Sequence, residues 1–181
     1  MTQTFTVDCG KSAQHLLQVT LEVTGLPPGQ HELAMPVWTP GAYRVADYAK
    51  NVFDVRVVGH PAQAIPVKKT TKNTWQFEGE GTVTVTYQVY CFQLGVTSSH
   101  CDGTHAYWNG TNVYVVVDGE QGTPIDLQIE APNGWRVSTG LDRVGDDAFH
   151  FRAPNFDILV DCPVEVGTQR VYPFEAMGKP H

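Results

Sequence analysis

Residues 17–24 read Leu-Gln-Val-Thr-Leu-Glu-Val-Thr, in which apolar and polar side chains alternate without interruption. A period of two places the apolar side chains on one face of a β-strand and the polar ones on the other. The segment therefore predicts a strand with one face in a core and one face in water. Gly-Leu-Pro-Pro-Gly follows at residues 25–29, a composition typical of a turn.

The same alternation recurs along the chain, and it is rich in Val and Thr, whose branched side chains suit a pleated surface. The further alternating segments are 53–57, 83–91, 127–130 and 149–152. Short strands separated by Pro, Gly and Asn turns predict two packed antiparallel sheets. The expected fold is all-β, an antiparallel β-sandwich-like domain with at most one short helix.

A few segments depart from this alternation. Val113–Val117 is an apolar run, which indicates a strand covered on both faces, and Ile158–Val160 is interpreted in the same way. The one short helix is expected at about Val45–Asn51, after the breaker residues Thr39-Pro40-Gly41. Residues 1–170 are expected to form one β-rich domain. Residues 171–181 open like a strand at Val171–Phe174 and are interpreted as the start of a link into a further domain.

Charge limits the classes of partner. The 181-residue chain has 12 Lys and Arg against 19 Asp and Glu, a formal net charge of −7. An acidic balance argues against nucleic acid and anionic membranes, both of which select clustered Lys and Arg. No apolar segment approaches the roughly 20 residues that span a bilayer, and residues 1–11 lack a signal-peptide core. We expect a cytoplasmic chain with no nucleic-acid partner and no membrane partner.

The four cysteines suggest a structural use. Cys9, Cys91, Cys101 and Cys162 form no C-x-x-C pair, and a chain of this length needs no disulfide to build a core. We expect reduced thiols, several of them buried as small apolar groups.

Two segments invite a metal interpretation. His31-Glu32-Leu33-Ala34-Met35 begins like the zinc-peptidase motif H-E-x-x-H, but methionine stands where the second histidine ligand is required. His100, Cys101, Asp102 and His105 form the densest ligand cluster in the chain. A polar turn at Asp102-Gly103 is the favoured interpretation, and a small metal site using His100, Cys101 and His105 is the alternative.

Two loops carry costly aromatic residues. Residues 35–43 place Trp38 and Tyr43 between prolines and glycine, and residues 93–111 form a long connection that contains Tyr107 and Trp108. Long connections without structure of their own are often functional. The four aromatic side chains could plug the end of a sandwich, face another domain, or form a surface platform. Asn109-Gly110 in the second loop is expected to be a tight hairpin turn.

Several segments, in this order, resemble the N-terminal domain of the glycyl aminopeptidase family of PDZ-containing bacterial zinc metallopeptidases. They are Pro36–Tyr43 (Pro-Val-Trp-Thr-Pro-Gly-Ala-Tyr), Asp47–Val52, Lys72–Trp75, Val85–Tyr90, Pro132–Trp135 and Phe156–Gly167. The resemblance extends over about residues 5–181. It implies that zinc and catalysis belong to a later domain, so that this chain has no catalytic residue, metal site or cofactor of its own.

The resemblance also implies partners. The expected ones are the catalytic domain of the same parent chain, against which this domain packs, and the N-terminus of a peptide substrate. In such relatives an acceptor from the first domain can hold the free α-amine of the substrate, and the candidates by position are Gln93, Asp102 and Asn109. The alternative function is a stand-alone β-sandwich module that binds carbohydrate or a partner protein through its aromatic side chains.

Overall fold

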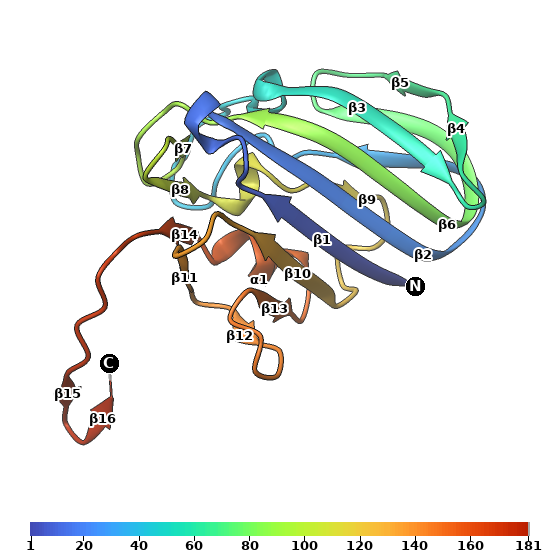
Figure 1. Cartoon of the computed structure of the whole chain (residues 1–181). Coiled ribbons are helices and arrows are strands. Elements are labelled where there is room, and N and C mark those ends of the chain that lie inside the picture. The colour runs from blue at the N-terminus through green and yellow to red at the C-terminus, as the bar shows by residue number, and fades with distance from the viewer. Residues whose placement is uncertain (181) are drawn as a thin grey trace.

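The structure, a computed structural model, describes residues 1–180, and its regular secondary structure is mainly β-strand, arranged in two main sheets (Figure 1). The larger sheet has the strand order β12-β13-β10-β1-β2-β6-β3-β4, with β5 added to β6 and β9 added to β2. Its strands are β1 (Thr2–Asp8), β2 (Leu16–Ala34), β3 (Val52–Gly59), β4 (Gln63–Ile65), β5 (Val67–Lys69), β6 (Thr74–Tyr90), β9 (Val116–Val117), β10 (Ile125–Glu130), β12 (Asp142–Arg143) and β13 (His150–Ala153). Within these two sheets only the β1–β10 pair is parallel.

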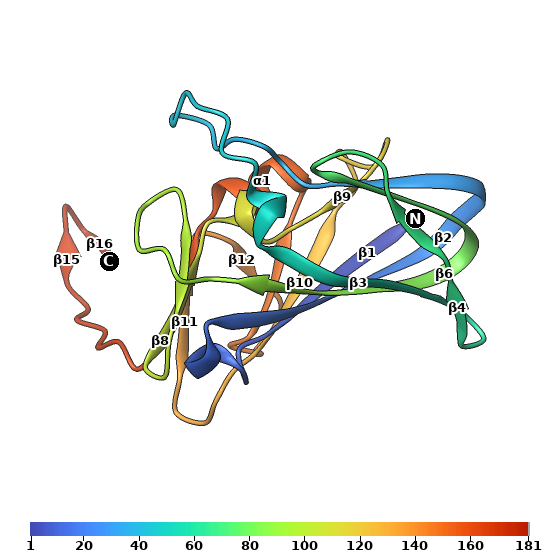
Figure 2. The ribbon, with the colours of Figure 1, turned by 90° about the horizontal axis from the view of Figure 1, so that it is seen from above.

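The smaller sheet has the order β11-β14-β8-β7 and lies at one end of the larger one (Figures 1 and 2). Its strands are β7 (Ser99–Cys101), β8 (His105–Trp108), β11 (Arg136–Thr139) and β14 (Val164–Gly167). A separate pair, β15 (Glu175–Ala176) and β16 (Lys179–Pro180), lies in the C-terminal segment that leaves the body at the same end. The all-β sandwich-like prediction is confirmed.

The helical content is small. The only α-helix among residues 1–180 is α1 (Phe156–Asp161), and three 3-10 turns accompany it: η1 (Ser12–Gln14), η2 (Tyr48–Asn51) and η3 (Gly110–Asn112). None of the described helices is long and apolar enough to cross a membrane.

The alternation in β2 produces the predicted half-buried strand. Leu17, Val19, Leu21 and Val23 are fully buried, and they oppose Val83, Val85, Tyr87 and Val89 of β6 across the pair. The core continues through β1 and β10 to the buried face of α1 and β14. The thiol prediction is confirmed as well: all four cysteines are free, and Cys9, Cys91 and Cys101 are buried.

The predicted turn at residues 25–29 is wrong, because β2 continues through it. Gly25 and Gly29 adopt φ of 81° and 142°, and the register with β6 shifts on either side of Leu26. The partner strand carries Gly79 and Gly81 at the same level. A bulge with glycines on both strands bends the pair without ending it.

Other local predictions also need correction. Ile158–Val160 lies in α1 rather than in a strand, because Asn155 caps the helix by accepting a hydrogen bond from the Ile158 N–H at 2.9 Å. The helix expected over Val45–Asn51 is only η2, and Val171–Phe174 forms no strand. Val113–Val117 is buried throughout, as predicted, but only its last two residues pair as a strand.

Candidate functional site

Two loops meet above the end of the large sheet and enclose a groove. One loop is residues 35–51, and the other is residues 92–98, which precede β7 (Figure 2). Two adjoining hollows between them share four lining residues, Asn51, Gln93, Ser98 and Asn112. We call this depression the loop groove and define it by these four residues.

The floor of the loop groove is a buried hydrogen-bond network that joins both loops to η3. The Thr39 hydroxyl lies 2.7 Å from the Tyr48 hydroxyl and 2.6 Å from the Thr111 hydroxyl. Thr111 donates to Asn109 Oδ1 at 2.6 Å, and Asn112 Nδ2 donates to the Thr97 carbonyl at 3.1 Å. Because buried polar groups are costly when unpaired, this network holds three chain segments in one arrangement.

Asn109 supports η3 and does not face the groove. Its side chain accepts a hydrogen bond from the Thr111 N–H, and its exposed fraction is only 6%. The hairpin turn predicted at Asn109-Gly110 is therefore wrong. Gly110 is required here for a different reason: a Cβ on it would lie 2.5 Å from Val160 Cα, so only glycine lets η3 pack this closely on α1.

Gln93 is the predicted acceptor that lines the loop groove. Its backbone N–H donates to the Ser99 carbonyl at 3.0 Å, which fixes the start of the loop, and its side chain is exposed. Asn112 faces it from the floor, and its backbone N–H donates to the Asn109 carbonyl at 2.9 Å. Sequence reasoning missed Asn112, because nothing in a polar turn shows which of its amides reaches the groove.

Asp102 lies elsewhere, at the tip of the β7–β8 hairpin. Its Oδ1 accepts hydrogen bonds from the Thr104 hydroxyl at 2.7 Å, the Thr104 N–H at 2.7 Å and the His105 N–H at 3.2 Å. These bonds lower the pKa of Asp102 from 3.8 to about 2. The structure thus separates Asp102 from Gln93 and Asn109, and the three predicted acceptors do not form one site.

Exposed apolar side chains surround the loop groove. The exposed fractions are 48% for Trp38, 91% for Tyr43, 69% for Val45, 77% for Leu94 and 82% for Val96. Single exposed apolar residues are ordinary, whereas these five, together with the exposed Phe92 on the same two loops, are typical of an interaction surface. We call these five residues the apolar rim.

The other two predicted aromatic residues have different roles. Trp108 is fully buried and donates from its indole N–H to the Tyr114 hydroxyl at 2.9 Å, so a surface position for it is wrong. Tyr107 is half-buried and donates to the Val96 carbonyl at 3.1 Å, which supports the second loop from below. Burial and the nearby Glu165 carboxylate raise the pKa of Tyr107. The four aromatic side chains therefore do not form one binding platform.

Most of the side chains that line the loop groove can form hydrogen bonds. None of the described residues that line its two hollows is an aspartate, glutamate, histidine or cysteine. Ser99, which is 5% exposed, also lines it, and its Oγ is buried without a hydrogen-bond partner within residues 1–180. The groove can therefore position a polar group, and its charged lining residues are the cations Arg44 and Lys50.

The segment that begins like a zinc-peptidase motif does not fit a zinc ion. His31 lies in β2 rather than on a helix, and its Nε2 is 2.9 Å from the Pro27 carbonyl. Met35 is buried and occupies the place of the second ligand. These residues cannot supply the paired imidazoles of a catalytic zinc site.

Comparisons with known proteins identify relatives that match almost the whole chain. Residues 4–168 match the family model described as the peptidase M61 N-terminal domain. An aminopeptidase N family protein from Idiomarina loihiensis superposes with a TM-score of 0.93 and 31% identity, over 99% of this chain and 32% of that protein. The chain therefore spans about a third of the length of that relative. No curated protein matches the chain significantly.

More distant structures share the fold. An M1 zinc metallopeptidase from Deinococcus radiodurans has a TM-score of 0.54 at 9% identity, over 92% of this chain and 41% of that protein. Native yeast LTA4 hydrolase has a TM-score of 0.51 at 11% identity, over 92% of this chain and 28% of that protein. At such low identity these two likenesses concern the fold alone.

Proposed function

The chain belongs to the peptidase M61 N-terminal domain family, and from this premise we propose that it is the non-catalytic β-domain of a glycyl-aminopeptidase-like zinc metallopeptidase. In that parent it packs on the catalytic domain and forms one wall of the substrate cleft. The catalytic zinc ion of this proposal belongs to the catalytic domain, and the His31–Met35 segment does not fit such an ion. A bacterial, cytoplasmic parent with a PDZ domain is part of the same proposal.

The observation that carries this proposal is the apolar rim around a polar groove at one end of the domain. The rim residues are exposed on loops that a buried network holds in place, so they present a preformed surface. The C-terminal segment leaves the body at this same end, which supports this end as the one that faces a following domain (Figures 1 and 2). The Idiomarina relative is long enough to contain such a domain.

Gln93 and Asn112 supply the substrate contact in this proposal. An exopeptidase must recognise a chain end, and the free α-ammonium group needs acceptors placed on a rigid scaffold. The carbonyl oxygens of two amide side chains at the loop groove are suitable acceptors. Two cations, Arg44 and Lys50, also line the groove and would repel the ammonium group; Lys50 is held by the Ala46 carbonyl at 3.1 Å, so the amide oxygens act against this positive charge.

The test is kinetic and uses the full parent enzyme. Gln93→Ala and Asn112→Ala should each lower kcat/KM for a glycyl anilide by about tenfold, a typical loss for one polar contact to a charged group. Gln63→Ala, an exposed glutamine on β4, is the matched control and should leave kcat/KM unchanged.

The isolated chain provides the second arm of the test. Residues 1–181 with added zinc should not hydrolyse the anilide. Metal-dependent hydrolysis by this chain alone would refute a non-catalytic role. Equal kcat/KM values for the parent enzyme and both groove variants would refute the substrate contact.

A further inference from the structure

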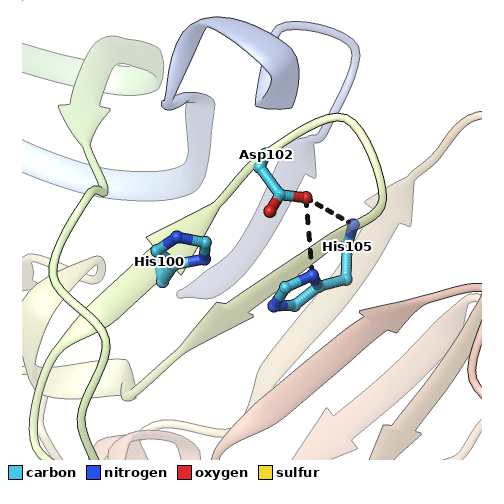
Figure 3. A group of neighbouring side chains, drawn as sticks. All are labelled: His100, Asp102 and His105. Carbon is cyan, nitrogen blue, oxygen red and sulfur yellow. Dashed lines mark hydrogen bonds and ion pairs between the residues drawn. The ribbon is translucent and has the colours of Figure 1, made fainter.

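The outward face of the β7–β8 hairpin gathers side chains that the proposed function does not use. In both strands alternate residues enter the core: Cys101 and Ala106 are fully buried, while His100 and His105 point outward. His100 pairs with Tyr107 across the ladder, so His105 is its diagonal neighbour on the same face. Two imidazoles therefore face each other beside the turn that holds Asp102 (Figure 3).

The distances within this group suit a shared ligand. The two imidazole rings are stacked with centroids 5.3 Å apart, and His105 Nδ1 is 3.4 Å from Asp102 Oδ1. One donor atom from each of His100, Asp102 and His105 lies within 4.8 Å of the other two, and no other group of this kind is found in residues 1–180. We call these three residues the hairpin triad.

The Asp102 carboxylate is oriented in advance. Every hydrogen bond and ion pair that the described structure gives this side chain ends on Oδ1. Figure 3 shows the same arrangement, with both dashed lines reaching one oxygen while the other oxygen lies on the side of the His100 ring. The second oxygen therefore needs no rearrangement of the turn in order to bind a cation.

His100 provides an independent observation. Its Nδ1 is buried and has no hydrogen-bond partner within residues 1–180. A buried polar atom without a partner costs free energy, and such atoms in a native fold call for an explanation. Its ring lies between Phe92, at a centroid distance of 5.5 Å, and His105, so the imidazole is held in place although Nδ1 has no hydrogen-bond partner within the described residues.

We propose that His100, Asp102 and His105 bind one divalent transition-metal ion, Zn²⁺ by the chemistry of the donors. Two imidazoles and a carboxylate favour Zn²⁺ over Mg²⁺ or Ca²⁺, which prefer oxygen ligands alone. Three donors that lie within 4.8 Å of one another are at most about 2.8 Å from a common point, whereas Zn²⁺ binds nitrogen and oxygen at about 2.0–2.2 Å. Side-chain rotations that move each donor atom by less than about 1 Å bring all three within bonding distance of the ion. Water completes the coordination.

This site differs from both expectations drawn from the sequence. The cluster was expected to be a polar turn without a metal, and its alternative used Cys101 as a ligand. Cys101 cannot serve, because it faces the core, and Asp102 takes its place. The metal would fix the hairpin whose first strand anchors the Gln93–Ser98 loop, since the Gln93 N–H donates to Ser99 of β7. The site does not depend on the proposed peptidase role.

The experiment uses the purified chain of residues 1–181, freed of metal by chelation and titrated with Co²⁺ and, in competition, with Zn²⁺. We expect one equivalent per chain with micromolar affinity and visible Co²⁺ absorption bands. We also expect saturating Zn²⁺ to raise the melting temperature by roughly 5–10 °C at a hundredfold excess over Kd.

Variants locate the ion. His100→Ala and His105→Ala should each weaken binding about tenfold or more, while His60→Ala, which removes an exposed histidine elsewhere, should not. If an alanine variant does not fold, His105→Gln tests the same ligand with a side chain of similar size. A chain that binds no Co²⁺ or Zn²⁺ stoichiometrically, or that binds equally well after both substitutions, would overturn the proposal.

Discussion

The paired strands β2 and β6 and the loop groove depend on different features of the sequence. Along residues 17–23 and 83–89 of this pair, the apolar residues are two positions apart and all of them meet one continuous core. At the groove, hydroxyl and amide groups from residues far apart in the chain meet only after folding. The comparison teaches that local periodicity builds the rigid part of this domain, while long-range polar contacts build the part that meets a partner.

The largest expected effect lies in the strand pair. Leu21→Ala removes a fully buried side chain at the centre of β2 and should lower the free energy of unfolding by about 2–5 kcal/mol. Thr20→Ala, on the outer face of the same strand, should change it by less than about 1 kcal/mol. Urea denaturation of the isolated chain measures both, and equal losses would contradict a one-sided core.

A smaller effect is expected in the network under the groove. Thr111→Val keeps the shape but removes the hydroxyl that Thr39 and Asn109 both contact, so that Thr39 keeps only Tyr48 and Asn109 Oδ1 keeps only the residue 111 N–H; the loss should cost about 1–3 kcal/mol. Thr86→Val on the outer face of β6 is the matched control and should be close to neutral. A neutral Thr111→Val variant would show that the groove is not held by its polar network.

The apolar rim should separate stability from function. Tyr43→Ser and Leu94→Ser remove exposed side chains, so the free energy of unfolding of the isolated chain should change by no more than about 0.5 kcal/mol. In the parent enzyme the same substitutions should lower activity, because they weaken contact with the catalytic domain. Val171→Ser, on the exposed C-terminal segment, serves as the control. Unchanged activity and unchanged stability together would remove the rim from the proposed interface.

The smallest effect concerns pH. Asp126 pairs with Arg152 through two hydrogen bonds of 2.8 and 3.0 Å, and this contact lowers the pKa of Asp126. A lowered pKa in the folded state stabilises the protein above the ordinary value of 3.8 and loses that contribution as pH falls below it. Arg152→Gln should therefore lower the melting temperature by at most about 3 °C at pH 7, and by less near pH 2. An equal loss at both pH values would contradict this origin.

Much of the scaffold could be predicted from the sequence, because strands with one buried face show their period directly. The errors occurred where the backbone departs from that period. The sequence around Leu26 has the composition of a turn but forms a bulge, and a second irregularity lies at Asp54, with φ of 54°, beside the exposed Phe53. The helix α1 was missed although Asn155 is a good N-cap, because three consecutive apolar residues suit a strand equally well.

The candidate site was less predictable. Gln93, Asp102 and Asn109 are equal candidates by position in the sequence; the structure places Gln93 at the groove, whereas Asn109 and Asp102 form structural hydrogen bonds. Which amide reaches a groove depends on contacts between distant segments, such as that of Asn112 with Thr97. A single sequence shows which residues are available for such contacts, but it does not show which of them contact each other in the fold.

Amide hydrogen exchange, compared between the isolated chain and the full parent enzyme, tests the central claim most directly. The account predicts that residues 38–46 and 93–98 exchange rapidly in the isolated chain and become protected in the parent, while residues 63–69 exchange alike in both. Protection confined to residues 63–69, with both groove loops equally exposed in the two proteins, would contradict it.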